Sequence, residues 1–212
     1  MAFSATGLGR GQTGPSMLRM ARSGNITRTT KETSIEASWD LDATGSEIAT
    51  GIGFFDHMLE ALAKHSGTRI CVKCDGDLHV DGHHTSEDVG IALGQCLREA
   101  LGDRSGVERF GHIACPLDEA LVQATVDLSG RAFLVYEVNP GTATIGEWAT
   151  ELVPEFLQGL TANAQICLHL HQICGRNSHH IIEAAFKAMA RALRQAIAIT
   201  GDEVPSTKGV LA

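Results

Sequence analysis

The spacing of apolar and polar residues repeats along this chain. An i, i+1, i+4, i+5, i+8 stripe of apolar residues predicts an amphipathic helix in the first half, and the same stripe recurs 98 residues later. The two stripes are Phe54, Phe55, Met58, Leu59 and Leu62, and then Leu152, Val153, Phe156, Leu157 and Leu160. A further matching pair of segments, separated by 96 residues, predicts a second helix in each half. We infer that one structural unit is duplicated.

Strand-like segments surround these helices. Six stretches of alternating or β-branched residues predict strands, at 33–39, 46–52 and about 68–74 in the first half and at 121–128, 131–138 and 164–170 in the second. We expect four strands and two helices per half. Because both helices of each half are amphipathic, the economical packing places helix layer against helix layer with a sheet outside each. The expected fold is α+β and internally duplicated, each half a four-stranded mixed sheet plus two helices, packed as a β-α-α-β sandwich.

The N-terminal segment has a different composition from the rest. Residues 1–25 are rich in Gly, Ser, Thr and Arg, and the first acidic residue of the chain is Glu32. This composition predicts a flexible extension, with a plastid transit peptide as the alternative. We expect half-repeats at 26–115 and 116–212, together forming one domain.

Charge and hydropathy exclude two classes of partner. The 212 residues carry a formal net charge of −8, with 17 lysines and arginines and no basic block. Because affinity for phosphate backbones comes from clustered cations, nucleic acid is not an expected partner. No apolar run approaches the roughly 18 residues that span a bilayer, so no membrane partner is expected either.

The six cysteines indicate a reducing compartment, and we expect the cytoplasm. Their positions do not form the pattern of a disulfide framework. The segment "CVKC" at 71–74 has the spacing of a zinc knuckle, but its alternating context predicts a strand. A strand would send Cys71 and Cys74 to opposite faces, which makes the knuckle the weaker interpretation.

Two histidine pairs carry the strongest chemical signal. They lie in "DGHHTSED" at 81–88 and "NSHHIIEA" at 177–184, and a glutamate follows each pair at helical spacing. The two sets are His83, His84 and Glu87, and His179, His180 and Glu183. An imidazole and a carboxylate three or four residues apart share one helix face, which is typical of half of a metal site. Histidines that only cap or solvate a helix start are the alternative, which two matching sets make the weaker reading.

The geometry of the pairs predicts shared metals. Adjacent side chains on a helix point about 100° apart, so each pair is expected to serve two different ions. Neither half can then complete either site, and further ligands must come from elsewhere in the fold or from a neighbouring subunit. His57 and either His169 or His171 offer such imidazoles. Imidazole with carboxylate and no thiolate suits manganese, iron, cobalt, nickel or zinc.

Other polar residues give weaker signals. The segment "VPSTKG" at 204–209 could hold a phosphate, although an exposed tail has the same composition. Arg109 and Arg131 each lie beside a glycine at the edge of a predicted element. Each alone is more often a surface arginine than an anion ligand. His65 lacks a partner carboxylate at helical spacing, as do His79 and His112.

The motifs together resemble one enzyme family. In chain order they are "GIGFFDHMLEAL", "DGHHTSEDVGIALG", "GVERFG", "PLDEAL", "LSGRAF", "GRNSHHIIEAAFKAMARALRQA" and "PSTKGVL". They resemble imidazoleglycerol-phosphate dehydratase, which dehydrates imidazole glycerol phosphate to imidazole acetol phosphate in histidine biosynthesis. The match runs from about Arg28 to the C-terminus.

The resemblance implies a set of site residues. It implies two manganese ions per active site, with four ligands each, and prefers His169 over His171 because of its distance before Asn177. The implied metal ligands are His57, His83, His84, Glu87, His169, His179, His180 and Glu183. Glu32 matches the acid/base residue. Phosphate and substrate contacts fall on Arg109, Arg131, Ser206, Lys208 and His65. The family's homo-oligomer is a 24-subunit cage built from trimers, with metals at subunit contacts.

The resemblance also implies a mechanism. Two metals on the ring nitrogens hold the substrate's imidazole as imidazolate, which expels the hydroxyl, and loss of a carbon-bound proton then gives the enol. Gly82 and Arg176 depart from the family's acidic residues at those positions, and since neither is a ligand we expect activity to be kept. Two other hypotheses are a dinuclear metallohydrolase, for which the motifs offer too few bridging carboxylates, and a non-catalytic metal-binding cage, which leaves Glu32 without a role.

Overall fold

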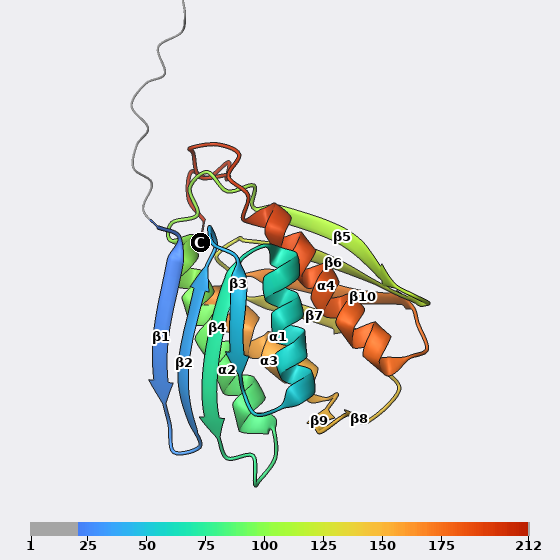
Figure 1. Ribbon diagram of the computed structural model, residues 1–212. Helices are drawn as coiled ribbons and strands as arrows, with labels where there is room; N and C mark the ends of the chain where they lie inside the picture. Colours follow the sequence, from blue (N-terminus) through green and yellow to red (C-terminus); the bar gives the residue numbers. More distant parts are fainter. Residues whose placement is uncertain (1–20, 212) are drawn as a thin grey trace, which may run out of the picture.

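A computed structural model describes residues 21–211 of the chain. In this part of the chain, two four-stranded sheets enclose four helices (Figure 1). The first half contains β1 (Ser23–Thr29), β2 (Thr33–Asp40), β3 (Gly45–Ala49), α1 (Gly53–Ser66), β4 (Arg69–Gly76) and α2 (His83–Leu101). The second contains β5 (Phe110–Leu117), β6 (Ala120–Asp127), β7 (Phe133–Glu137), β8 (Thr144–Ile145), β9 (Trp148–Ala149), α3 (Leu152–Ala164), β10 (Cys167–Cys174) and α4 (Ser178–Ala196).

The two sheets have corresponding strand orders. The first is β1-β2-β4-β3 and the second is β5-β6-β10-β7, and in each the last pair is parallel and the others are antiparallel. Along β2, Ile35, Ala37 and Trp39 face the helices while the residues between them face out. One face of each sheet is therefore buried, as the alternating pattern predicts.

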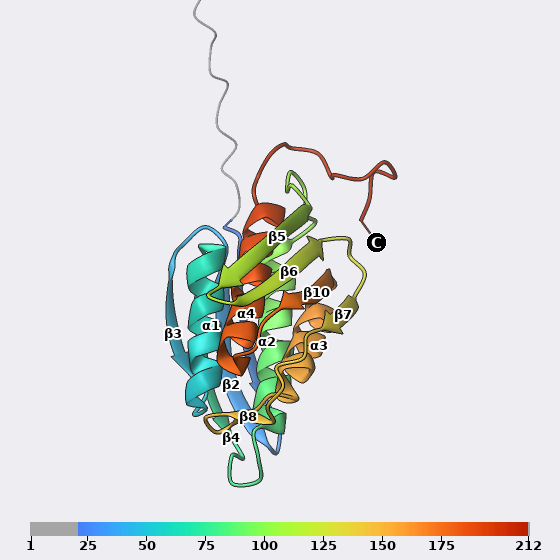
Figure 2. The ribbon, with the colours of Figure 1, turned by 90° about the vertical axis from the view of Figure 1, so that its right-hand side faces the viewer.

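The helices form the two inner layers. α2 packs on β1 and β2 and contacts α3, while α4 packs on β5 and β6 and contacts α1. Figure 2 shows the second sheet with α4 and α2 behind it. This arrangement confirms the duplicated β-α-α-β sandwich.

Glycines let α2 and α3 approach closely. A Cβ on Gly94 would lie 2.5 Å from the Leu160 carbonyl oxygen of α3, and a Cβ on Gly159 would lie 2.8 Å from the Glu87 carbonyl oxygen of α2. Any larger residue would push the two backbones apart. The interface between the two halves therefore depends on these small residues.

Aromatic residues fill the centre between the layers. Phe55 of α1 stacks on Trp148 at 4.8 Å between ring centroids and meets Phe156 of α3 edge-on at 5.2 Å. The Trp148 indole N–H donates to Ser86 Oγ at 2.9 Å, which satisfies the one polar group of this buried ring. The described residues of both halves therefore share one hydrophobic core.

Several predicted boundaries are wrong. β5 pairs with β6 in the second sheet, so the first half ends in the loop before Phe110 and not at residue 115. The strand expected at 46–52 ends at Ala49, because Gly51 has a positive φ of 84° and turns the chain into α1. β1 begins at Ser23, so Ser23–Asn25 belong to a strand and not to the N-terminal extension. Residues 1–20 of that extension lie outside the described residues.

Two local findings complete the fold. Cys71 and Cys74 lie on opposite faces of β4, as the strand interpretation predicts. Among residues 21–211, none of the helices combines the length and the apolar character needed to cross a bilayer.

Candidate functional site

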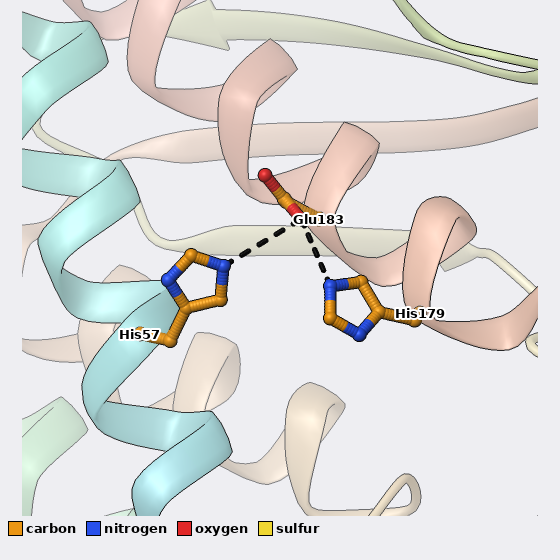
Figure 3. Close-up of side chains that lie close together, drawn as sticks. All are labelled: His57, His179 and Glu183. Atoms are coloured by element: carbon orange, nitrogen blue, oxygen red, sulfur yellow. Dashed lines mark hydrogen bonds and ion pairs between the residues drawn. The ribbon is translucent and has the colours of Figure 1, made fainter.

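Three of the predicted metal ligands meet between α1 and α4. His57 projects from α1, and His179 and Glu183 project from α4 (Figure 3). Glu183 Oε2 lies 3.0 Å from His179 Nε2 and 3.6 Å from His57 Nε2. One ligand atom from each residue lies within 4.8 Å of the other two. The cluster joins the first half of the chain to the second.

Local structure places these side chains. The Asn177 side chain caps α4 by accepting hydrogen bonds from the backbone N–H groups of His179 at 3.0 Å and His180 at 3.3 Å. The histidine pair therefore lies in the first turn of α4, where its rings project past the helix end. At the start of α1, Asp56 accepts a hydrogen bond from the Thr50 backbone N–H at 2.9 Å and so fixes the turn of the helix that carries His57.

Lys187 makes Glu183 a stable anion. Burial opposes ionisation of Glu183, but the hydrogen bond and charge of Lys187, with its Nζ 2.7 Å from Oε1, and the contact with His179 outweigh it and lower the pKa of Glu183. Phe54 covers the cluster on one side, with its ring centroid 4.9 Å from that of His179. Two imidazoles and an ionised carboxylate form a donor set that fits a divalent cation.

The two rings of each histidine pair lie in nearly perpendicular planes. The ring planes stand at 86° between His83 and His84 and at 85° between His179 and His180. His180 accordingly contacts Glu119, with Nδ1 2.8 Å from Oε2, and not Glu183. Within one pair, the two imidazoles therefore serve different neighbours.

The second histidine of each pair is held by a carboxylate. His84 Nδ1 lies 2.9 Å from Asp77 Oδ2, and this hydrogen bond raises the pKa of His84. The hydrogen bond to Glu119 likewise raises the pKa of His180. The pKa of Glu119 is lowered to about 2 by that hydrogen bond and by the backbone N–H groups of Asn177 and Arg176. Glu87 makes no hydrogen bond or ion pair with either histidine of its half in the described chain.

His169 lies apart from the other predicted ligands. Along β10, Leu168 and Leu170 are buried against the helices, so His169 and His171 face outward. His171 Nδ1 lies 2.9 Å from Glu137 Oε2 on that outer face. The second sheet therefore separates His169 from the cluster of its own chain.

The predicted phosphate-binding residues gather at one edge of the second sheet. The strand register aligns Phe110, Asp127, Cys167 and Phe133, which brings the segments before β5 and β7 to the same edge. Arg109 and Arg131 precede these two strands. Both arginines therefore lie at the same end of the strands, but β6 and β10 separate the two outer strands that they precede.

Arg109 is fixed by its neighbours. Its φ is 74°, its Nε donates to Asp127 Oδ1 at 2.8 Å and its Nη1 donates to the Pro205 carbonyl at 2.9 Å. Arg109 and Ser206 line a common groove beneath the 200–207 segment. Lys208 follows, with its backbone N–H 3.2 Å from Ser206 Oγ. The structure brings these three residues together.

The cluster of His57, His179 and Glu183 and the predicted phosphate-binding edge lie at opposite ends of α4. The Arg109 N–H donates to the carbonyl of Ala196 at the end of this helix, whereas His179 lies at its start. At about 1.5 Å per residue, the two ends are roughly 25 Å apart. One small substrate cannot reach both ends within a single chain.

Glu32 lies beside the first histidine pair. It occupies the β1–β2 turn, where its carbonyl accepts a hydrogen bond from the Asp77 N–H at 3.0 Å. Its charge contributes to the raised pKa of His84. His65 is elsewhere, in the last turn of α1, where burial and then the charges of Lys187 and Arg191 lower its pKa. His65 therefore belongs to the α1–α4 side and Glu32 to the α2 side.

Three residues of the site were not predicted. Lys187 follows Glu183 by four residues, which is ion-pair spacing that the sequence already contains. Glu119 lies within the quoted "PLDEAL" motif, but nothing in the sequence relates it to His180. Asp77 likewise has only the fold to connect it with His84.

The chain is similar to known proteins of one enzyme family. The sequence model of the family described as imidazoleglycerol-phosphate dehydratase matches residues 50–193. The chain is 57% identical to the imidazoleglycerol-phosphate dehydratase of Acidiphilium cryptum, over 91% of this chain and 100% of that protein. It is 55% identical to the one from Rhodopseudomonas palustris strain CGA009, over 90% of this chain and 98% of that protein.

Solved structures are similar as well. The crystal structure of imidazoleglycerol-phosphate dehydratase from Staphylococcus aureus superposes with a TM-score of 0.77 at 38% identity, covering 84% of this chain and 99% of that one. The enzyme from Pyrococcus furiosus, in complex with (S)-C348, gives a TM-score of 0.74 at 39% identity, covering 88% and 100%.

Proposed function

The chain belongs to the imidazoleglycerol-phosphate dehydratase family, and from this premise we infer that two manganese ions on its paired histidines serve the dehydration. The reaction removes water from imidazole glycerol phosphate, a step of histidine biosynthesis. The enzyme is thus a hydro-lyase. Neither the metallohydrolase nor the non-catalytic cage finds support in these relatives.

One observation carries the metal proposal. His57, His179 and Glu183 converge from two helices so that one ligand atom of each lies within 4.8 Å of the others. Imidazole and carboxylate without thiolate suit manganese. The other ligands of the two ions would be His83, His84, Glu87, His169 and His180. None of these five approaches the cluster closely enough to complete it in the described chain, so neighbouring copies would supply the missing donors.

The positions of His169 and of the phosphate-binding edge support shared active sites. His169 faces outward from the second sheet, and Arg109 lies at the far end of α4 from His179. If a second copy of the chain places its metal cluster against that outer face, His169 can act as a ligand and Arg109 can contact the phosphate of the same substrate. We propose a homo-oligomer of 24 subunits built from trimers, with the metals at subunit contacts.

Chain residues would divide the work of the reaction. When bound, the metal ions supply Lewis acidity that favours the imidazolate form of the substrate ring. Glu32 is exposed beside the first histidine pair, where its carboxylate can take the carbon-bound proton and return a proton to the leaving hydroxyl. Loss of water gives an enol, which tautomerises to the ketone. Its exposed position beside His84 supports Glu32 as the acid/base group.

The phosphate would be held at the edge of the second sheet. Arg109, Arg131 and Lys208 supply positive charge, and Ser206 supplies a hydroxyl donor. Charge-assisted hydrogen bonds to phosphate are strong and directional, and Arg109 is already oriented by Asp127. His65, with its pKa lowered, would approach the substrate as a neutral imidazole.

We place the enzyme in the cytoplasm. Its six cysteines are free, including Cys174 on the surface. Exposed and unpaired thiols are typical of a reducing compartment.

The proposal is tested on chelator-stripped protein. Turnover is followed by the ultraviolet absorbance of the imidazole acetol phosphate enolate before and after Mn²⁺ is added, with the molecular mass measured in parallel. We expect activity and a large assembly to appear together with Mn²⁺. Assembly with metal but without turnover would contradict the roles of Glu32 and the phosphate-binding residues, and turnover unchanged by chelation would contradict the metal.

A further inference from the structure

Asp77 and Glu119 contact the second histidine of each pair and lie outside the predicted ligand set. Asp77 Oδ2 is 2.9 Å from His84 Nδ1, and Glu119 Oε2 is 2.8 Å from His180 Nδ1. An ionised carboxylate can only accept a hydrogen bond, so the imidazole Nδ1–H donates in both contacts. The ring proton is therefore held on Nδ1, and the Nε2 lone pair of each histidine accepts no hydrogen bond in the described chain. The nearest carboxylate to His180 Nε2 is that of the exposed Asp118, whose Oδ2 lies 3.8 Å away, beyond hydrogen-bond distance.

Glu119 is itself held in place. Its Oε1 accepts hydrogen bonds from the backbone N–H groups of Arg176 at 3.0 Å and Asn177 at 2.7 Å. These two residues lead directly into the histidine pair of α4. The carboxylate from the β5–β6 turn thus binds the start of the helix with one oxygen and the imidazole with the other. The two backbone N–H donors hold the Glu119 carboxylate in place, so the acceptor that His180 Nδ1–H meets is itself fixed.

Asp77 is fixed by different contacts. Its side chain is 16% exposed, and its backbone N–H donates to the Glu32 carbonyl at 3.0 Å. It lies just after β4 in its own half, whereas Glu119 reaches His180 from the turn between two strands. The same carboxylate–imidazole contact therefore arises twice from non-equivalent positions. Simple inheritance from the duplicated unit does not explain this.

The two β-hairpin turns show what has diverged. Glu32 ends the β1–β2 turn and Glu119 ends the β5–β6 turn, so the two glutamates hold corresponding places in the duplicated unit. Glu119 is bonded to His180. Within residues 21–211, the Glu32 carboxylate accepts no hydrogen bond, since Asp77 occupies the position at His84. Glu32 therefore stays available for proton transfer, and Glu119 does not.

We propose that Asp77 and Glu119 are positioning residues, which fix the ring orientation and tautomer of His84 and His180 so that each Nε2 is directed to a metal ion. This inference rests on the proposed metal function. Carboxylate partners of this kind orient a metal-binding histidine, and their loss typically weakens metal affinity about 10–100-fold. Their effect passes through the histidine, so neither residue contacts the substrate.

Substitution of Glu119 distinguishes positioning from a merely structural role. In Glu119→Gln, the amide oxygen must face the two backbone N–H donors of Arg176 and Asn177, which leaves the amide NH₂ toward His180. That NH₂ donates to Nδ1 and forces the proton onto Nε2, the wrong nitrogen. In Glu119→Ala the ring is released but can still adopt either tautomer. Glutamine should therefore harm metal binding more than alanine, although it preserves more of the structure.

The experiment titrates chelator-stripped, full-length protein with Mn²⁺ and reads the free ion by its six-line electron paramagnetic resonance signal. The variants are Glu119→Gln, Glu119→Ala and the matched control Glu137→Gln, which alters the same contact at His171, outside the ligand set. We expect Glu119→Gln to lower the affinity for one of the Mn²⁺ equivalents by about 10–100-fold, which is a larger loss than in Glu119→Ala. The melting temperature should instead be lower in Glu119→Ala than in Glu119→Gln. The control should bind as the unaltered protein does.

Two results would overturn the inference. In one, Glu119→Gln binds Mn²⁺ as the unaltered protein does. In the other, the loss of affinity follows the loss of melting temperature, with alanine worse than glutamine in both. Failure of the unaltered protein to bind Mn²⁺ would instead reject the metal proposal itself and the inference with it.

Discussion

At the residue scale, the spacing of His179 and Glu183 is enough to bring their ligand atoms together, because both project from one face of α4. The contact between His179 and Glu183 can therefore be predicted from the sequence alone. The contacts of Glu119 with His180 and of Asp77 with His84 cannot be predicted in this way. Each carboxylate is one of 25 acidic residues, and only the fold connects it with its histidine. Side chains that act across a turn or between strands leave no periodic signal.

His57 tests the cluster directly. Replacement His57→Ala removes one of three convergent donors and leaves α1 otherwise intact, since the side chain is 49% exposed. We expect the affinity for one Mn²⁺ equivalent to fall by more than the roughly 10–100-fold that follows loss of a carboxylate orienting a metal-binding histidine. Turnover should fall with it. Calorimetric titration of the metal-free variant measures this. His112→Ala, an exposed histidine outside the ligand set, should titrate normally, and equal losses in both variants would count against the cluster.

Asn177 tests how the second histidine pair is positioned. Asn177→Ala removes the side-chain acceptor of the His179 and His180 N–H groups, and loss of such a cap costs about 1 kcal/mol of unfolding free energy. Urea unfolding of the metal-free protein measures the change. Asn177→Ser keeps a capping oxygen and should lose much less. Equal stability of the alanine and serine variants would show that the cap does not stabilise this helix start.

At the element scale, the helices follow from the sequence more fully than the strands do. The stripe from Phe54 to Leu62 predicts α1 because a helix period is sustained over several turns. Strand ends depend on pairing partners, and the boundary expected at residue 115 falls inside β5, a strand that the alternation did not predict. β8 and β9 have two residues each, too few for any alternation to be recognised. Long elements with a sustained period can thus be predicted, whereas strand ends and two-residue strands cannot.

Gly94 tests the contact between the two halves. In Gly94→Ala the new Cβ would lie 2.5 Å from the Leu160 carbonyl oxygen and 2.8 Å from Asn163 Cβ, so α2 and α3 must separate. We expect a loss of about 1–3 kcal/mol in unfolding free energy, measured by chemical denaturation. Gly53→Ala is the control, because nothing lies within 4 Å of its added Cβ. A neutral Gly94→Ala would contradict the close packing of these helices.

At the scale of the whole molecule, the proposed site residues of one chain lie too far apart to form one active site. The proposed metal cluster lies at the start of α4, the proposed phosphate-binding edge lies at its end, and His169 faces out from the second sheet. The sequence predicts that ligands must be shared, because each histidine pair points in two directions. It cannot predict which surfaces meet, since periodicity describes one chain and not its neighbours.

Complementation between inactive variants tests the central claim, that each active site is built from more than one subunit. His169→Ala and His179→Ala are each stripped of metal, mixed and reassembled with Mn²⁺, and turnover is measured. If His169 of one copy serves the cluster of another, mixing restores up to about a quarter of the activity, because that fraction of shared sites has both histidines. His179→Ala mixed with Glu183→Ala is the control and should stay inactive, because both residues come from one α4. No recovery in the first mixture, with assembly intact, would contradict the shared site.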